Sequence, residues 1–286
     1  MKPLIKGKIQ LLLSCTLAIA GCSKDNIDSP DEDITHSKYV TKLFEYVPAP
    51  GQFINDASFG TEEAAKSILG KGDGIVSLGA FGGYIVLGFD HAVINQKDMN
   101  DIAVYGNAQA SFAEPGIVWV MQDENNNGLP DDTWYELKGS EYGKVGYIKN
   151  YEVTYFKPKQ TDEGVRWEDN KDNTGLIRLN ADHRQAYFPE WIDKDAYMLS
   201  GSLLPNTNVS TSTSAFVTSS PFAWGYADNL EGRNDLDINN AIDSDGEKVD
   251  LQAIDFIKIQ TGILADLGQL GEFSTEIVSV EDLSTP

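Results

Sequence analysis

Short segments in which apolar and polar residues alternate recur along the chain, and they constrain the fold more than any other feature. The strand-like segments lie at residues 74–79, 83–90, 101–108, 116–123, 150–158, 174–180, 196–204 and 253–262. Clusters of Gly, Asn, Asp and Pro, which favour turns, separate them. Alternation with period two is typical of strands with one buried face, and no alternating series of strands and helices indicates a parallel sheet. The sequence therefore predicts an all-β fold, an antiparallel β-sandwich of the jelly-roll type with long loops.

One segment, residues 61–70, predicts a short helix within this all-β chain. Its sequence is TEEAAKSILG, in which Thr61 is placed to cap the N-terminus and Gly70 to end the helix. We find no internal repeat at a fixed period. We therefore predict a single domain over residues 39–286, with a long insert between strands at residues 122–146.

The first residues predict an export signal that ends at a lipid attachment site. Lys2, Lys6 and Lys8 are followed by an apolar run too short to span a membrane, and the run ends in small residues before Cys22. The last four residues, IAGC, resemble a lipobox, in which the cysteine thiol carries the lipid. Residues 1–21 would then be the signal peptide, and the lipid on Cys22 would be the only membrane attachment. An ordinary secretory signal is the alternative.

The segment 22–38 predicts a flexible tether. It is acidic and rich in Ser and Asp, so it has too few apolar residues to pack a core. Ser23-Lys24-Asp25 resembles the export tag that places lipoproteins of Bacteroidota on the outer face of the outer membrane. Retention on the periplasmic face is the alternative.

The charge and the cysteine and histidine content exclude several classes of function. The 286 residues carry a net charge of −22, which repels phosphate backbones and argues against nucleic-acid binding. Cys15 and Cys22 both lie near the start, so the folded body has no disulfide and no cysteine-based metal site. With only His36, His91 and His183 to supply imidazole, the sequence also argues against a multi-histidine zinc site.

An acidic loop at residues 122–136 predicts a calcium site. Asp123, Asn125 and Asn127 alternate and Gly128 follows, as in the first half of an EF-hand loop. The predicted ligands are Asp123, Asn125, Asn127, the backbone carbonyl of Leu129, Asp131, Asp132 and Glu136. Hard oxygen donors favour calcium over zinc, and the missing helical flanks indicate a structural ion. The alternative is an Asn/Asp-rich turn closed by hydrogen bonds between side chains and backbone.

A second acidic cluster is a weaker candidate for a metal site. It comprises Asp237, Asp243, Ser244, Asp245 and Gly246. The sequence DSDG within it is also a good turn signal.

Aromatic residues in polar segments are the candidate ligand-binding residues. They are Trp134, Tyr135, Tyr142, Trp167, Trp191, Trp224 and Tyr226, with Tyr187 in a similar segment. Flat rings on loops supply stacking area for a sugar ring or the edge of a corrin at small entropic cost. The alternative is that each ring closes an edge of the sandwich. The polar segment 206–229, which ends in PFAWGYADN, is a candidate binding loop or a plain connection.

Several separated motifs resemble one family of secreted bacterial β-sandwich proteins. They lie at residues 78–95, 101–120, 122–143, 224–229, 236–262 and 271–283. The chain looks like cell-surface lipoproteins of Bacteroidota, some of which are accessories of TonB-dependent uptake systems, including those for vitamin B12 and related cobamides. This resemblance implies a β-sandwich that captures a ligand beside an outer-membrane transporter.

The sequence favours a binding protein over an enzyme. Carboxylates that could form a glycosidase pair are Glu114, Glu136, Glu141, Glu168 and Glu190. The chain has neither a G-x-S-x-G elbow nor an HExxH motif, and we expect no enzymatic activity. We expect a lipid-anchored surface protein that captures a nutrient, best matched by a cobamide, for a TonB-dependent transporter. The alternatives are a calcium-dependent glycan-binding module and a structural scaffold of a transporter complex.

Overall fold

The computed structural model describes residues 35–210 and 217–285, and within them strands dominate. Each of the eight segments predicted as strands contains one, so the all-β prediction is confirmed. Cys22, the signal peptide and most of the predicted tether lie outside the described residues. Residues 211–216 of the polar segment lie outside them as well.

The largest sheet has six antiparallel strands with β15 near its centre. Its order is β1 (Lys42–Val47), β3 (Tyr84–Ile94), β15 (Ala253–Thr261), β5 (Gly116–Met121), β6 (Tyr135–Leu137) and β14 (Ala241–Ile242). The predicted insert at residues 122–146 is therefore not a plain loop, because β6 lies within it and pairs with β5.

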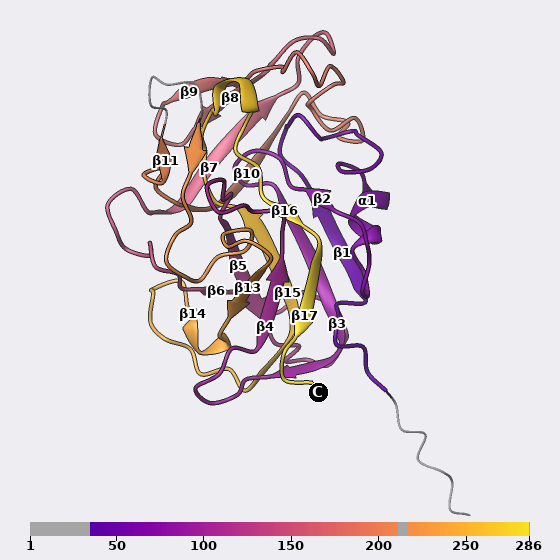
Figure 1. Ribbon diagram of the computed structural model, residues 1–286, viewed down its shortest axis with the longest axis vertical. Coiled ribbons are helices and arrows are strands. Elements are labelled where there is room, and N and C mark those ends of the chain that lie inside the picture. The colour runs from indigo at the N-terminus through magenta and orange to yellow at the C-terminus, as the bar shows by residue number, and fades with distance from the viewer. Residues whose placement is uncertain (1–34, 211–216, 286) are drawn as a thin grey trace, which may run out of the picture. The chain divides into compact units, whose positions relative to one another are not determined.

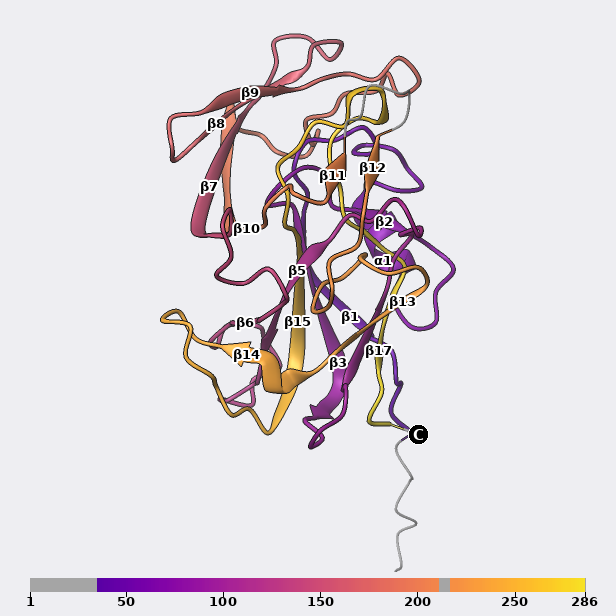
Figure 2. The same cartoon turned by 60° about the vertical axis from the view of Figure 1, so that its left-hand side comes forward.

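A second layer packs against one face of this sheet. It contains β13 (Arg233–Leu236), β4 (Ile102–Tyr105) and β17 (Ser279–Asp282), with the short pair β16 (Glu276–Ile277) and β2 (Val76–Ser77). Leu87 and Ile257 from the six-stranded sheet meet Val104 and Val280 from this layer in one fully buried core. Figures 1 and 2 show the two layers facing each other.

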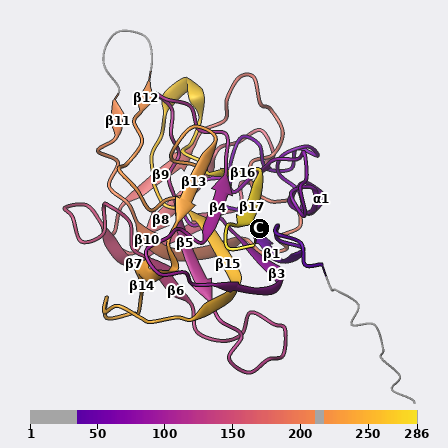
Figure 3. The ribbon, with the colours of Figure 1, turned by 60° about the horizontal axis from the view of Figure 1, so that its bottom comes forward.

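A separate four-stranded sheet extends the molecule at one end, at the top of Figure 1. Its order is β10 (Ala196–Leu203), β7 (Ile148–Phe156), β8 (Val165–Asp169) and β9 (Thr174–Ile177). It has a core of its own around Phe81, Tyr151, Tyr155 and Tyr187. The short strands β11 (Val209–Ser210) and β12 (Thr218–Ser219) pair within the polar segment, and both are labelled at the upper left of Figure 3.

The predicted helix is present as α1 (Glu62–Ser67). The Thr61 hydroxyl accepts a hydrogen bond from the backbone N–H of Ala64 at 3.2 Å, as an N-cap does. Gly70 lies just beyond the helix with φ +67°, a conformation that suits glycine. Two single turns of 3-10 helix complete the described elements, η1 (Ile238–Asn240) and η2 (Gly268–Leu270). Among the described residues, no helix is long and apolar enough to cross a membrane.

Candidate functional site

A row of side chains crosses the outer face of the six-stranded sheet. Lys258 on β15 lies opposite Trp119 on β5, and Trp119 lies opposite Glu136 on β6. On the other side of β15, Lys258 pairs with Val86 on β3, which pairs with Glu45 on β1. Residues directly opposite in an antiparallel sheet share a face. The residues on either side of Lys258 are buried in the sandwich core, so this row points away from that core.

Lys258 is the one charged residue of this row that the fold leaves without a partner. Its ammonium lies 4.3 Å from the ring centroid of Tyr84 and 5.2 Å from that of Trp119. Among the described residues, the ammonium has no hydrogen bond and no carboxylate within 4.0 Å. Burial lowers the pKa of Lys258, an effect that the negative charge of Glu45 only partly opposes. The aromatic faces stabilise the cation but leave its hydrogen-bonding capacity free.

Strand β10 forms one wall above this row. It approaches the sheet closely at Gly201, where any β-carbon would collide with the side-chain oxygen of Gln260. Gln260 in turn donates from Nε2 to the carbonyl oxygens of Gly82 at 2.7 Å and Ser200 at 3.0 Å. A buried glutamine therefore ties the four-stranded sheet to the six-stranded sheet beside Lys258.

Two hollows adjoin at Lys258 and Ser200, and we call them together the Lys258 groove. The first has a volume of about 260 Å³, and its lining includes Trp119, Trp134, Glu136, Lys149, Asn150 and Ser202. The second has a volume of about 600 Å³, and its lining includes Val47, Tyr84, Trp191, Tyr197 and Met198. The groove thus combines aromatic rings and hydroxyl and amide groups with the ammonium of Lys258, and Lys149, Lys194, Asp193 and Asp243 add further charges to its lining.

Glu136 lines the groove and does not belong to the acidic loop, contrary to the sequence prediction. Its two carboxylate oxygens accept hydrogen bonds from the hydroxyls of Tyr147 at 2.7 Å and Ser202 at 2.6 Å. Burial raises the pKa of Glu136, and these two hydrogen bonds oppose the shift. Because β6 pairs with β5, the position of Glu136 is set by the sheet and not by the loop before it.

The remaining predicted calcium ligands do lie together. The Asp123 carboxylate accepts the backbone N–H groups of Asn127 at 3.1 Å and Gly128 at 2.8 Å. The side-chain amides of Asn125 and Asn127 donate to the carboxylate of Asp131 at 3.0–3.1 Å.

The rest of the loop is closed by similar contacts. Asp132 accepts the backbone N–H of Glu124 at 3.0 Å, and Leu129 donates its N–H to the Asn127 side chain at 2.7 Å. Asp255 on β15, which the sequence did not single out, anchors the loop by accepting the N–H of Asp123 at 2.7 Å. Gly128 has φ +73°, as the sharp turn requires. The loop is thus a hydrogen-bonded turn with a set of oxygen donors, and it leads directly to Trp134.

Two of the predicted ligand-binding aromatics reach the groove. Trp134 lines the first hollow and Trp191 lines the second. Trp191 is 47% exposed and packs at 6.1 Å between ring centroids against Tyr46. The two tryptophans come from distant parts of the sequence, so their shared groove depends on the fold.

The other predicted aromatics lie outside the groove. Trp167 lies against Gly175 beside a smaller hollow, and Trp224 is exposed on a loop. Tyr135 packs against the sandwich core, and the ring of Tyr142 lies close to the ammonium groups of two lysines. Tyr226 is buried, and its hydroxyl accepts a backbone N–H. Tyr187 is buried too. The burial of Tyr187 and Tyr226 supports the alternative interpretation of these two rings, in which they pack within the fold and do not bind a ligand.

The second acidic cluster is split by the fold. Asp237 caps η1 by accepting the N–H of Asn239 at 2.7 Å. Asp243 instead accepts the N–H groups of Asp245 and Glu247, both at 2.9 Å, in a tight turn. Within the described residues these contacts match the turn signal that the sequence DSDG carries.

Among the carboxylates considered for a glycosidase pair, Glu114 lies in a buried cluster with Asp228 and Glu276. Asp228 accepts the N–H groups of Asn107 and Ala108 at 2.9 Å and of Glu276 at 3.0 Å. Burial raises the pKa of all three carboxyl groups, and their mutual repulsion adds to the shift for Glu114 and Glu276. The cluster is enclosed by the fold, so it offers no access to a substrate.

Lys258, Tyr84 and Trp119, the residues at the centre of the groove, were not predicted as site residues from the sequence. One signal was present, since Lys258 interrupts the apolar strand AIDFIKIQT. A lysine in a central strand indicates either a paired charge or an outward-facing site. In comparisons with known proteins, no family model matched the chain and no curated protein sequence matched it.

Proposed function

We propose that this protein is a non-catalytic, lipid-anchored surface protein that captures a nutrient in the Lys258 groove for a TonB-dependent outer-membrane transporter. The single observation that supports a capture site is the ammonium of Lys258, which faces the groove between Tyr84 and Trp119 without a carboxylate partner. A cation held ready in this way favours a ligand that brings an anionic or hydrogen-bond-accepting group. The aromatic lining favours flat or apolar faces on the same ligand.

A cobamide is the first candidate, following the resemblance at the level of sequence. Its corrin offers a broad ring system for stacking on Trp134 and Trp191, and its phosphodiester offers the anion for Lys258. The second hollow, at about 600 Å³, has a size typical of small-molecule sites. The combined groove suits a ligand that extends over both hollows.

A glycan is the second candidate, because hydrogen-bonding groups alternate with rings around the first hollow. Asn150, Ser200 and Ser202 lie there beside two tryptophans. Sugars present the same combination of hydroxyl groups and apolar ring faces. A uronic acid would also supply a carboxylate for Lys258.

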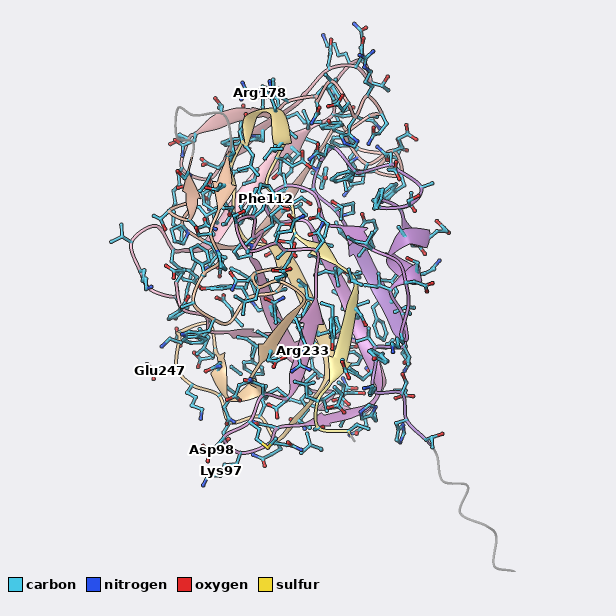
Figure 4. The ribbon with its side chains drawn as sticks, viewed as in Figure 1. Lys97, Asp98, Phe112, Arg178, Arg233 and Glu247 are labelled. Carbon is cyan, nitrogen blue, oxygen red and sulfur yellow. The ribbon has the colours of Figure 1, made fainter. Side chains whose placement is uncertain are left out.

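Calorimetric titration separates these candidates. The purified full-length chain is titrated with cyanocobalamin, with neutral oligosaccharides and with oligosaccharides that contain uronic acids. For the true ligand, we expect Lys258→Met to weaken binding at least tenfold, because a charge-assisted contact contributes roughly 1.5–3 kcal/mol. Lys97→Met is the matched control, since Lys97 is exposed in the turn at the bottom of Figure 4. Equal binding by both variants, or no heat with any of the probes, would contradict the groove as the capture site.

We further propose that calcium binds the acidic loop and thereby fixes Trp134 at the groove. What supports this proposal is that the side-chain oxygens of Asp123, Asn127, Asp131 and Asp132, a donor type that calcium prefers, lie within one hydrogen-bonded turn. Such an ion would cross-link the loop by holding carboxylates that otherwise repel one another. It would add no chemistry to the groove beyond the placement of Trp134.

The melting temperature tests the calcium proposal. We expect the wild type to melt at a higher temperature in calcium than in EDTA, because an ion that binds only the folded state stabilises it by roughly 2.7 kcal/mol at one hundred times its Kd. Asp123→Ala should melt at a lower temperature that is the same in calcium and in EDTA. Identical melting of the wild type in both buffers would show that hydrogen bonds alone close the loop.

A further inference from the structure

We propose that His36, Asp90 and His91 form a binding site for a divalent transition metal, with zinc as the best match. The three side chains bring one donor atom each to within 4.8 Å of one another. This site goes against the expectation from the sequence, in which the presence of only three histidines argued against a multi-histidine zinc site. It is independent of the proposed capture function, since His91 lies seven residues beyond Tyr84 along β3, roughly 23 Å for an extended strand.

His91 is held between two carboxylates. Its Nδ1 lies 2.8 Å from Oδ1 of Asp90, and its Nε2 lies 2.8 Å from Oδ2 of Asp282. The Asp282 side chain is fully buried on β17 and is fixed further by the backbone N–H of Ser284 at 2.7 Å. The ring of His91 therefore has a defined orientation.

His36 brings a second imidazole to the same oxygen. Its Nδ1 lies 3.6 Å from Oδ1 of Asp90, and its ring lies beside that of His91, with 5.1 Å between centroids and 36° between the ring planes. The backbone N–H of Ser37 donates to the other oxygen of Asp90 at 3.2 Å. Oδ1 of Asp90 is thus the oxygen that faces both imidazoles.

The geometry leaves a place for a cation between these donors. A neutral imidazole has one N–H group, and when Nε2 of His91 donates to Asp282, the lone pair on Nδ1 faces the negative oxygen of Asp90. A proton on Nδ1 relieves that repulsion, but it engages only one of the two imidazoles. A metal ion in the same place binds Nδ1 of both histidines and Oδ1 of Asp90 together.

The chemistry of the donors selects the ion. Two imidazoles and one carboxylate are a ligand set for zinc, with a fourth position open to water. Bonds of about 2.0–2.2 Å place the ligands of a tetrahedral ion roughly 3.4 Å apart, so the present spacing needs only small side-chain rotations. Asp282 then takes the position of the carboxylate that accepts the second ring N–H of a metal-bound histidine and orients it.

A metal bound at this site would cross-link the segment before β1 to β3, and through Asp282 to β17. His36 precedes β1, while Asp90 and His91 belong to β3 and Asp282 to β17. Figures 1 and 3 show the C-terminus and the first residues of the folded body at the same end of the molecule. A bound metal would hold this end together where the predicted tether enters.

Zinc titration of the purified full-length chain tests the proposal. Calorimetry in excess calcium keeps the acidic loop occupied, and we expect one zinc ion per chain. His36→Ala should weaken zinc binding at least tenfold, because it removes one ligand from an exposed position without opening the core. His183→Ala is the matched control, since that ring packs against Phe53 and should leave zinc binding unchanged.

Two further readouts distinguish a metal site from a site that binds only a proton. Zinc should raise the melting temperature of the wild type and of His183→Ala, but not that of His36→Ala. Asp282→Asn, which keeps its shape, should weaken zinc binding by about 10- to 100-fold. No zinc binding in excess calcium, or equal zinc binding by His36→Ala and His183→Ala, would overturn the proposal.

Discussion

The Lys258 groove and the buried cluster of Glu114, Asp228 and Glu276 both withdraw charged side chains from bulk water, but the fold treats them differently. In the cluster, the fold supplies hydrogen-bond donors to each carboxylate: Asp228 accepts three backbone N–H groups, Glu114 accepts the N–H of Ser274, and Glu276 accepts the Ser274 hydroxyl. In the groove, the described residues give the ammonium of Lys258 only the faces of two aromatic rings. The carboxylates of the cluster find their partners within the fold, whereas the ammonium of Lys258 keeps hydrogen-bond donors without an acceptor in the described part of the chain.

This difference separates groups that serve the fold from a group available to a ligand. Burial raises the pKa of each carboxyl group of the cluster, so the fold disfavours their charged forms. Lys258 keeps access to a cavity, so an external anion can complete its contacts. We therefore expect substitutions in the cluster to change stability strongly, and substitution of Lys258 to change binding with little effect on stability.

The largest effect on stability is expected for Asp228→Ala. The substitution leaves three buried N–H groups without an acceptor, at roughly 1–3 kcal/mol each, so we expect the free energy of unfolding to fall by about 3–6 kcal/mol. Urea unfolding measures the change. Asp235→Ala, which removes an exposed carboxylate paired with Arg233, is the control and should cost less than about 1 kcal/mol. If the two variants unfolded at the same urea concentration, the cluster would not support the fold as described.

Unfolding measured at several pH values tests whether Glu276 holds a proton in the folded chain. In the folded chain, burial first and then the charge of Asp228 raise the pKa of Glu276, whereas the unfolded value is about 4.3. Between these two values the unfolded state loses its proton while the folded state keeps it. The contribution of protonated Glu276 to the free energy of unfolding is therefore fully present below about pH 4, and it is lost as the pH rises to the pKa of the folded state.

Glu276→Gln removes one titrating group with little change in shape. Relative to the wild type, the variant should gain about 2 kcal/mol of stability between pH 5 and pH 8, because each pH unit in that window contributes at most about 1.4 kcal/mol. Urea unfolding at several pH values provides the measurement. Parallel curves for the two proteins would mean that Glu276 is ionised in the folded state throughout.

The strands were predictable because their signal is local. An alternating apolar pattern with turn residues on both sides marks β3 and β15 without knowledge of their neighbours. Strand β6 was missed because it has only three residues, Tyr135–Leu137, and exists through its pairing with β5. A strand of that length has too little pattern of its own to be recognised.

The sites were less predictable because each depends on contacts between distant segments. The acidic loop is contiguous in sequence, so most of its predicted members lie together in one turn, whereas Glu136 lies in the groove. The groove brings Trp134, Trp191 and Lys258 together from three separate segments. His36 and Asp282 lie almost 250 residues apart, and each contacts one member of the pair Asp90 and His91 on β3. Hydrophobic pattern predicts which face of a strand is buried, but it does not predict which strands share an edge.

The smallest effect on stability, and the sharpest test of the comparison, is expected for Lys258→Met. Methionine keeps the length and apolar stem that cover Trp119, and it removes a charge whose burial is unfavourable. The loss of two contacts with aromatic rings, roughly 0.5–1 kcal/mol each, offsets that gain. We expect the free energy of unfolding to stay within about 1 kcal/mol of the wild type in urea unfolding at pH 7, while ligand affinity falls. If Lys258→Met instead lost as much stability as Asp228→Ala, the ammonium would be part of the fold, and the groove would lose the feature that distinguishes it from the buried cluster.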